Sequence, residues 1–144
     1  MNKVLLFLVI FSCGQLLAQS SDRYNSVYKT FYQAEYLFQK DQYAAARKEF
    51  HLFMNEFDEE NDPFYVKASF YEAISALELY NNDAIDLLLL FNKNYPESIY
   101  KTRISFKLGQ YFYYKKKYDE SLTWFNKLSI QDVEEYDRDE FYFK

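Results

Sequence analysis

The residue types that most often carry catalysis or bind metals are rare in this chain. His51 is the only histidine and Cys13 the only cysteine among 144 residues. A catalytic or zinc-bound histidine needs partner groups at hydrogen-bonding or ligand spacing, and none recurs around His51. We therefore expect His51 to lie exposed on a helix, one residue past the apolar Phe50. We also expect a protein that is not an enzyme, with no catalytic residue, metal site or cofactor.

The segment DEENDP, residues 58–63, is rich in carboxylates. A calcium-binding EF-hand loop needs glycine at its sixth position and glutamate at its twelfth, and Pro63 and Ser69 stand at those places. The segment is typical of a solvated loop, with adventitious calcium binding as the alternative. Asp62 followed by Pro63 predicts the start of a helix, with aspartate as its N-cap.

The strongest basic run is Lys115–Lys117. Positive charge at the end of a helix complements the negative end of its dipole, and an anionic partner is the alternative explanation. The whole chain has a net charge of −5, whereas proteins that follow a phosphate backbone carry a basic stripe. We expect no nucleic-acid partner. The acidic segment at 132–140 is typical of a solvated loop.

The N-terminal residues resemble an export signal. Lys3 precedes the apolar run 4–11, which is too short to span a bilayer, and Ala18 offers a small residue for cleavage. We interpret residues 1–18 as a signal peptide. A lipid-anchored Cys13 and an uncleaved anchor are the alternatives, so a membrane partner is expected only if Cys13 is lipidated. Cleavage after Ala18 would leave no cysteine, and packing alone would stabilise the fold.

The remainder of the chain has the pattern of an all-α protein. Only two prolines and two glycines are present, whereas aromatic residues make up 22%. Apolar residues recur at four-residue steps, as in Ile104, Leu108 and Phe112, or at three-residue steps, as at positions 122, 125 and 128. The predicted helices cover residues 23–40, 43–57, 63–80, 83–95, 98–115 and 118–128, and a seventh begins near Arg138. Short connections make neighbouring helices antiparallel.

Small residues recur at a nearly constant interval along these helices. In the first helix of each pair they are 39 and 36 residues apart: Ala34, Ala73 and Gly109. In the second helix they are 38 and 37 residues apart: Ala46, Ala84 and Ser121. Four residues after each of the latter stands a large apolar residue: Phe50, Leu88 and Phe125. This periodicity indicates a repeat of about 37 residues.

The repeat resembles the tetratricopeptide repeat. Its pattern is matched by Leu108-Gly109-x2-Phe112 with Ser121-x3-Phe125, and Tyr118 stands at the usual aromatic opening of the second helix. Partial matches are Ala84-x3-Leu88-x7-Pro96 and Tyr43-x2-Ala46-x3-Phe50. The resemblance covers residues 24–133. It implies a right-handed solenoid of antiparallel hairpins, with repeats at about 24–60, 61–97 and 98–133.

Two further expectations follow from this resemblance. Residues 134–144 look like the start of a fourth repeat that continues in a longer protein, so the last apolar face would favour self-association. The phrase NYPES at residues 94–98 is similar to exported tetratricopeptide proteins of Gram-negative envelopes. The resemblance therefore implies location in the periplasm or at the outer membrane.

The resemblance also implies where a partner would bind. In this family the first helices line a concave face that binds peptides, and the small residue allows two helices to cross closely. The matching positions are Phe31, Glu35, Phe38, Phe70, Leu77, Phe106, Gln110 and Tyr113. The alternative is that these rings pack between adjacent repeats.

The expected function is that of a non-catalytic scaffold of the envelope that binds a protein or peptide. The first alternative is a glycan-binding lipoprotein that builds its sugar site on the same scaffold. The second is an N-terminal scaffold within a longer protein whose activity lies elsewhere.

Overall fold

The computed structural model describes residues 25–57 and 59–129. Within these ranges every regular element is a helix, which confirms the all-α class. None of the described helices is both long enough and apolar enough to cross a membrane. The expected signal peptide and the helix expected near Arg138 lie outside the described residues.

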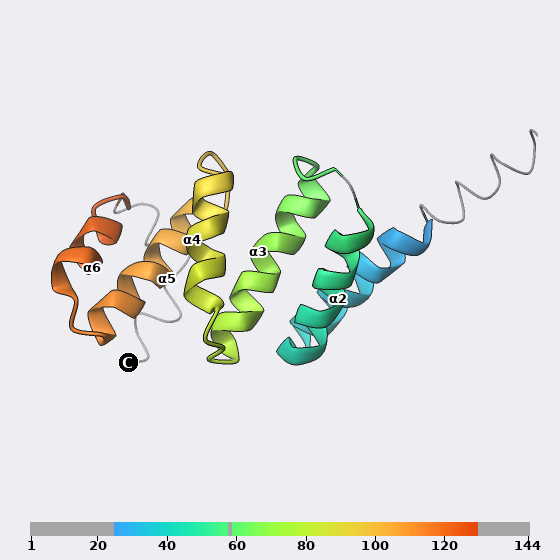
Figure 1. Ribbon diagram of the computed structural model, residues 1–144, viewed down its shortest axis with the longest axis horizontal. Helices are drawn as coiled ribbons and strands as arrows, with labels where there is room; N and C mark the ends of the chain where they lie inside the picture. The colour runs from blue at the N-terminus through green and yellow to red at the C-terminus, as the bar shows by residue number, and fades with distance from the viewer. Residues whose placement is uncertain (1–24, 58, 130–144) are drawn as a thin grey trace, which may run out of the picture. The chain divides into compact units, whose positions relative to one another are not determined.

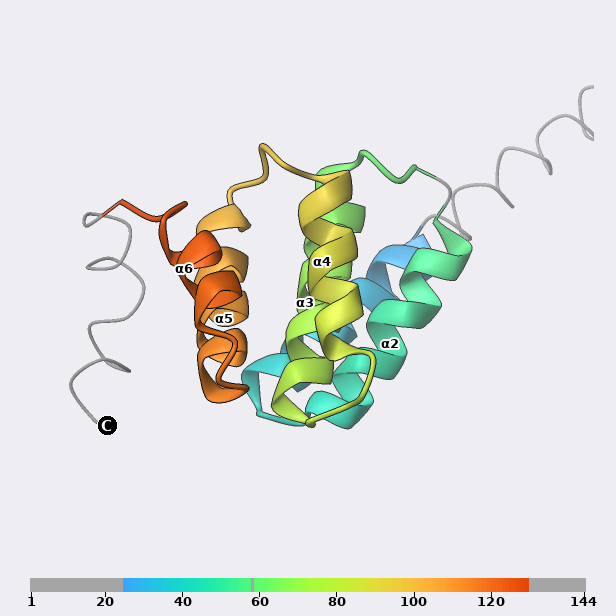
Figure 2. The same ribbon diagram turned by 60° about the vertical axis from the view of Figure 1, so that its left-hand side comes forward.

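Six helices follow one another along the described chain (Figures 1 and 2). Residues 25–39 form the first described helical stretch. The others are α2 (Tyr43–Glu56), α3 (Pro63–Glu78), α4 (Ala84–Asn94), α5 (Lys101–Tyr114) and α6 (Tyr118–Phe125). The starts of α2, α3 and α6 fall where the sequence pattern predicted them.

The start of α3 follows from the capping chemistry of Asp62. The backbone N–H of Phe64 donates to the Asp62 carboxylate at 2.7 Å. Pro63, which has no N–H to satisfy, occupies the first helical position. The Asp-Pro signal was therefore interpreted correctly.

The start of α5 differs from the prediction by almost one turn. The Ser98 hydroxyl accepts a hydrogen bond from the N–H of Tyr100, two residues on, at 3.3 Å. Ser98 thus closes a local turn in place of capping a helix, and the helix begins at Lys101. The predicted range of 98–115 therefore located the helix but not its first residue.

The helices at 25–39, α3 and α5 end in the same backbone motif. Each is followed by a residue with a left-handed backbone: Asp41 (φ 57°), Tyr80 (φ 55°) and Lys116 (φ 58°). The N–H of each donates to the carbonyl three residues back, and the next N–H donates five residues back. These are the two hydrogen bonds of a Schellman motif, built here without glycine.

The left-handed position of the second turn is Tyr80. Asparagine tolerates positive φ better than tyrosine does, yet Asn81 and Asn82 stand directly after this position. Asp83 stands at the N-cap of α4 and makes no capping hydrogen bond through its side chain. The hydrogen bonds of the helix end set the conformation here, and residue preference does not.

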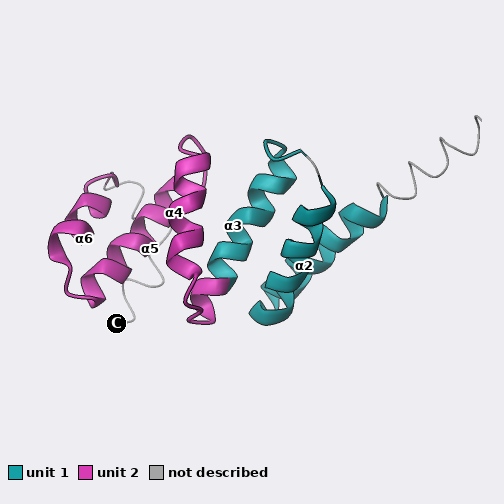
Figure 3. Ribbon diagram, viewed as in Figure 1, with its two compact units in different colours: residues 1–75 teal, residues 76–144 magenta. Residues whose placement is uncertain are grey.

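The described chain divides into two units, residues 1–75 and 76–144 (Figure 3). The core of the first unit consists of interlocking aromatic rings around small residues. Phe31, Phe50 and Phe53 are fully buried, and the Phe31 ring centroid lies 5.2 Å from that of Phe53. Ala34 and Ala46 are also fully buried, which leaves the space that the rings fill.

The second unit packs α5 against α4 and α6. Leu88, Ile104 and Leu108 are fully buried in it. The Ser121 hydroxyl on α6 donates to the carbonyl of Gly109 on α5 at 2.8 Å. Both small residues of this hairpin therefore lie buried where the two helices meet.

Candidate functional site

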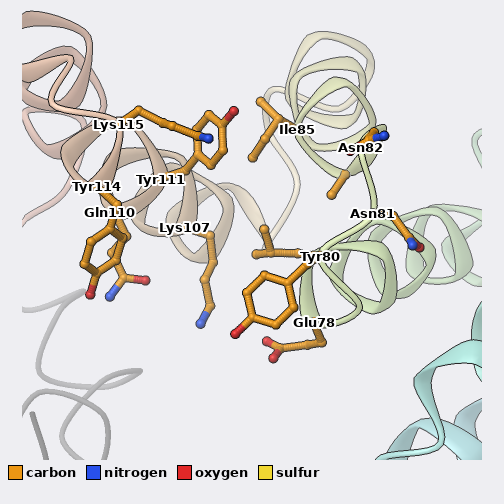
Figure 4. Close-up of a pocket in the computed structure, with 12 residues that line it drawn as sticks. Glu78, Tyr80, Asn81, Asn82, Ile85, Lys107, Gln110, Tyr111, Tyr114 and Lys115 are labelled. Atoms are coloured by element: carbon orange, nitrogen blue, oxygen red, sulfur yellow. The ribbon is translucent and has the colours of Figure 1, made fainter.

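The second unit contains an open groove of about 560 Å³ (Figure 4). One wall is formed by the end of α3, the following turn and the start of α4. These elements contribute Leu77, Glu78, Tyr80, Asn81, Asn82, Ala84 and Ile85. The other wall is α5 from its middle onward together with the residue that follows it, and it contributes Lys107, Gln110, Tyr111, Tyr114 and Lys115.

The α5 wall is a single helical face. Positions 107, 110, 111 and 114 recur at steps of three and one, which places their side chains on one side of an α-helix. The apolar residues of the same helix, Ile104 and Leu108, are buried elsewhere in the unit. The helix is thus amphipathic, and its polar-aromatic face lines the groove.

The Schellman turn positions the other wall. The left-handed backbone of Tyr80 ends α3, and Asn81 and Asn82 follow directly. The Tyr80 side chain is 93% exposed, so its ring is available at the rim of the groove. Tyr114, on the opposite wall, is 68% exposed. In Figure 4 Tyr80 comes from the turn after α3, and Tyr114 comes from α5.

The groove brings together groups suited to binding. It contains three phenol rings, three side-chain amides, two lysines and one carboxylate, beside apolar Leu77 and Ile85. The Lys115 ammonium lies 5.7 Å from the centroid of the Tyr111 ring, within the range of a cation–π contact. Such side chains stack on planar groups, donate and accept hydrogen bonds, and pair with charges.

Charge is distributed unevenly around this site. From residue 98 to residue 118 the sequence has no aspartate or glutamate and six basic residues: Lys101, Arg103, Lys107, Lys115, Lys116 and Lys117. Lys101 pairs with Glu97 at 3.1 Å, and Lys117 pairs with Glu120 at 3.6 Å. The α5 wall is therefore locally basic in an acidic chain.

Two of the eight positions expected on a concave face, Leu77 and Gln110, line the groove. Tyr113 is 57% exposed and lies outside the lining, where its ring packs against Tyr118. Phe31 and Phe70 have no exposed surface, and Phe106 is 8% exposed. A ring without exposed surface cannot contact a partner in this conformation.

The two remaining positions have neighbours in the first unit. The Glu35 carboxylate pairs with the Lys67 ammonium. The Phe38 ring lies 4.5 Å, centroid to centroid, from that of Tyr71. Glu35 and Phe38 thus take part in contacts among the helices of that unit.

The positions of the repeat pattern also differ in how far they are buried. Those with at most 2% exposure are Ala34, Ala46, Phe50, Ala73, Ala84, Leu88, Leu108 and Ser121. Gly109 is buried as well, Phe112 and Phe125 are half-buried, and Pro96 and Tyr118 are exposed. The small residues and their large partners on α2 and α4 are thus core positions.

His51 is exposed, as expected, but it has a partner that the sequence did not reveal. Its Nδ1 atom lies 3.1 Å from a carboxylate oxygen of Glu72, which is 11% exposed in its side chain. The two residues are 21 positions apart and lie on α2 and α3. Among the described residues no group of three histidine, cysteine, aspartate or glutamate side chains is placed to hold a metal ion.

The sequence interpretation missed Tyr80, Tyr111, Tyr114 and Lys107 as groove residues. Two signals could have found them. The absence of acidic residues between positions 98 and 118 marks the basic wall. The spacing of Lys107, Gln110, Tyr111 and Tyr114 marks the one face of α5 that is not apolar.

Comparisons with known proteins give no further assignment. No protein-family model, no curated protein and no solved structure matches this chain. The function is therefore argued from the residues and geometry described above.

Proposed function

We propose that this chain is a non-catalytic scaffold of the tetratricopeptide type that binds another protein in the cell envelope. The observation that carries the proposal is the groove in the second unit. Its walls present exposed rings, amides and charged groups on helices and on the turn after α3, and exposed tyrosines are typical of protein-binding surfaces. Such a surface can bind a partner without any catalytic group.

The recurring turn supports the repeat architecture. The left-handed residues Asp41, Tyr80 and Lys116 each stand seven positions after the small residue of the preceding helix: Ala34, Ala73 and Gly109. The turn and the sequence pattern thus share the intervals of 39 and 36 residues. A solenoid of three such hairpins, right-handed as in tetratricopeptide proteins, is the architecture we propose.

The N-terminal sequence pattern supports the proposed location in the cell envelope. Lys3, the apolar run 4–11 and Ala18 together have the pattern of a signal peptide. Mass spectrometry of the protein from the periplasm or envelope tests this directly. A chain that begins at Gln19 supports export in soluble form, a lipidated Cys13 supports an anchored form, and an intact Met1 contradicts both.

The binding function is tested by selecting peptides from a random display library on the purified chain. We expect enrichment of a peptide family whose binding is lost when Tyr114 and Gln110 are replaced by alanine. The matched control replaces Tyr36 and Gln33, which are exposed on the first described helix. No enriched peptide, or loss of binding only in the control variant, would contradict the proposal.

A glycan is the second candidate ligand. Three phenol rings beside the amides of Asn81, Asn82 and Gln110 could stack on sugar rings and bond their hydroxyl groups. Titration with neutral oligosaccharides, followed by tyrosine fluorescence, separates this candidate from peptide binding. Saturable binding of a sugar that the Tyr114→Ala variant loses would favour the glycan.

A further inference from the structure

We propose that the groove of the second unit takes an extended peptide with two acidic side chains about four residues apart and an aromatic side chain between them. This inference rests on the proposed protein-binding function and adds the chemistry of the partner. Its basis is the arrangement of charge and rings on the two walls.

The charge on the α5 wall selects acidic side chains. Lys107 and Lys115 both line the groove, and Lys116 and Lys117 follow on the exposed turn beyond it. The dipole of α5 accounts for lysines just past its C-terminus, but it does not account for Lys107 in the middle of the helix. Cations in the middle and at the C-terminal end of one wall attract a peptide whose negative charges are spread along its length.

The spacing of the two lysines sets the spacing of the acids. Lys107 lies on α5 and Lys115 is the residue directly after its last turn, eight positions on. A rise of 1.5 Å per residue separates them by about 12 Å along the helix axis. An extended chain advances about 3.3 Å per residue, so about four residues cover that distance. Positions i and i+4 of an extended peptide point to the same side, and both carboxylates can therefore face α5.

The tyrosines select the side chain between the acids. Tyr111 and Tyr114 lie between Lys107 and Lys115 along α5, and Tyr80 stands on the opposite wall. Position i+2 of the peptide faces the same wall as positions i and i+4, which brings it to these rings. An aromatic side chain there would pack against phenol rings from one or both walls.

Glu78 places a negative charge on the wall opposite the two lysines. It is the only carboxylate among the groove-lining residues, so acids held near α3 would be repelled. The peptide's acidic side must therefore face α5, and a neutral or basic side can face Glu78. The charges of the two walls thus determine which side of the peptide faces α5 and which side faces Glu78.

The test is fluorescence anisotropy with a labelled peptide Ser-Glu-Ser-Phe-Ser-Glu-Ser. Two matched peptides replace both glutamates by glutamine or by lysine. We expect the acidic peptide to bind at least tenfold more tightly than the glutamine peptide, with an advantage that shrinks as salt rises. Equal affinity of the acidic and glutamine peptides would overturn the inference.

Charge reversal supplies the second arm of the experiment. The Lys107→Glu/Lys115→Glu variant should lose the acidic peptide at least tenfold and gain the lysine peptide. The control is Lys48→Glu/Lys93→Glu, which reverses two exposed lysines outside the groove. An acidic peptide that binds both variants alike would mean that the groove lysines do not select it.

A ring deletion that spares the backbone supplies the third arm. Tyr80→Gly removes the ring at a position where glycine adopts the left-handed conformation freely. It should weaken binding of the acidic peptide without lowering the melting temperature. Asp41→Gly makes the same backbone change at the equivalent turn of the first unit and should leave binding unchanged. Unchanged binding in Tyr80→Gly would remove that ring from the site.

The outcomes separate this inference from the function on which it rests. Peptides from the display library that bind the groove but carry no acids would overturn the acidic motif and leave protein binding in place. Neutral oligosaccharides that bind while no peptide does would overturn both. Binding of the acidic peptide that only the groove variants lose supports both.

Discussion

The ring of Phe125 on α6 lies directly over Gly109 on α5. A Cβ atom added at Gly109 would be 2.5 Å from Cε1 of that ring and 2.7 Å from Cδ1. No ordinary carbon contact is that short, so any side chain at position 109 must displace the ring. The hydrogen bond from Ser121 to the Gly109 carbonyl holds the same two helices together one turn before Phe125.

This contact predicts a dependence between the two positions. Gly109→Leu should lower the free energy of unfolding by about 1–3 kcal/mol through overpacking. Gly109→Ala should be neutral or mildly destabilising, because the displaced ring offsets the gain of about 0.5–1 kcal/mol in helix propensity. Denaturant melts of both variants measure this.

A double-mutant cycle isolates the ring as the cause. Phe125→Leu alone should destabilise the hairpin, but in its background Gly109→Ala should become stabilising. If Gly109→Ala has the same effect with phenylalanine and with leucine at position 125, the ring is not what excludes a side chain.

Two buried serines predict opposite effects of the same substitution. The Ser121 hydroxyl donates to the Gly109 carbonyl, so Ser121→Ala should destabilise by about 1 kcal/mol. The Ser75 hydroxyl is fully buried and has no hydrogen-bond partner among the residues that the structure describes. Ser75→Ala removes an unsatisfied group and should stabilise by about 1 kcal/mol. Thermal melts of the two variants measure these effects. Destabilisation by Ser75→Ala would contradict the prediction.

The left-handed turns predict stabilising glycines. Lys116→Gly and Tyr80→Gly should each raise the free energy of unfolding by about 0.5–1 kcal/mol, because a left-handed backbone costs about 1–2 kcal/mol with a side chain. Asp41→Gly should gain less, because aspartate tolerates this conformation and its carboxylate accepts a hydrogen bond from the Tyr43 hydroxyl at 2.8 Å. Destabilisation by glycine at Lys116 would contradict the assigned backbone.

Tyr65 predicts a loss of stability in alkali. Burial, followed by the charges of Glu60 and then Glu72, raises the pKa of Tyr65 above its usual 10.0. The folded state therefore holds this proton more tightly than the unfolded state does. This contribution to stability is complete below pH 10.0 and is lost as pH rises through the raised pKa. Tyr65→Phe should lower the pH dependence of the melting temperature above pH 10, and an unchanged slope would contradict the assignment.

The sequence predicted the all-α class and the limits of most helices. Asp62-Pro63 marked the start of α3 because capping is a local interaction that two adjacent residues encode. The start of α5 was predicted too early, at Ser98, because the Ser98 hydroxyl accepts a hydrogen bond within a local turn and does not cap the helix. The left-handed backbone of Tyr80 is not evident from the sequence, because the N–H groups of Tyr80 and Asn81 donate to earlier carbonyls and impose it against the preference of tyrosine.

The candidate site was harder to predict than the fold. Leu77 and Gln110 were named because the repeat pattern marks them, and both line the groove. Tyr80 lies in a turn that the pattern leaves open, and its role depends on how α3 ends. Phe31 and Phe70 were named by the same pattern, but their rings are buried. Periodicity locates a helical face and does not say whether another helix covers it.

The bond between Ser121 and Gly109 spans only 12 residues of chain, and this short span bears on how fast the protein folds. Contacts between residues near in sequence lose little loop entropy when they form, so chains rich in them reach the native state in microseconds to milliseconds. The α5–α6 hairpin could then serve as an early nucleus whose formation needs no distant strand or helix. In stopped-flow refolding, Ser121→Ala would then slow the folding arm of the chevron more than it speeds the unfolding arm.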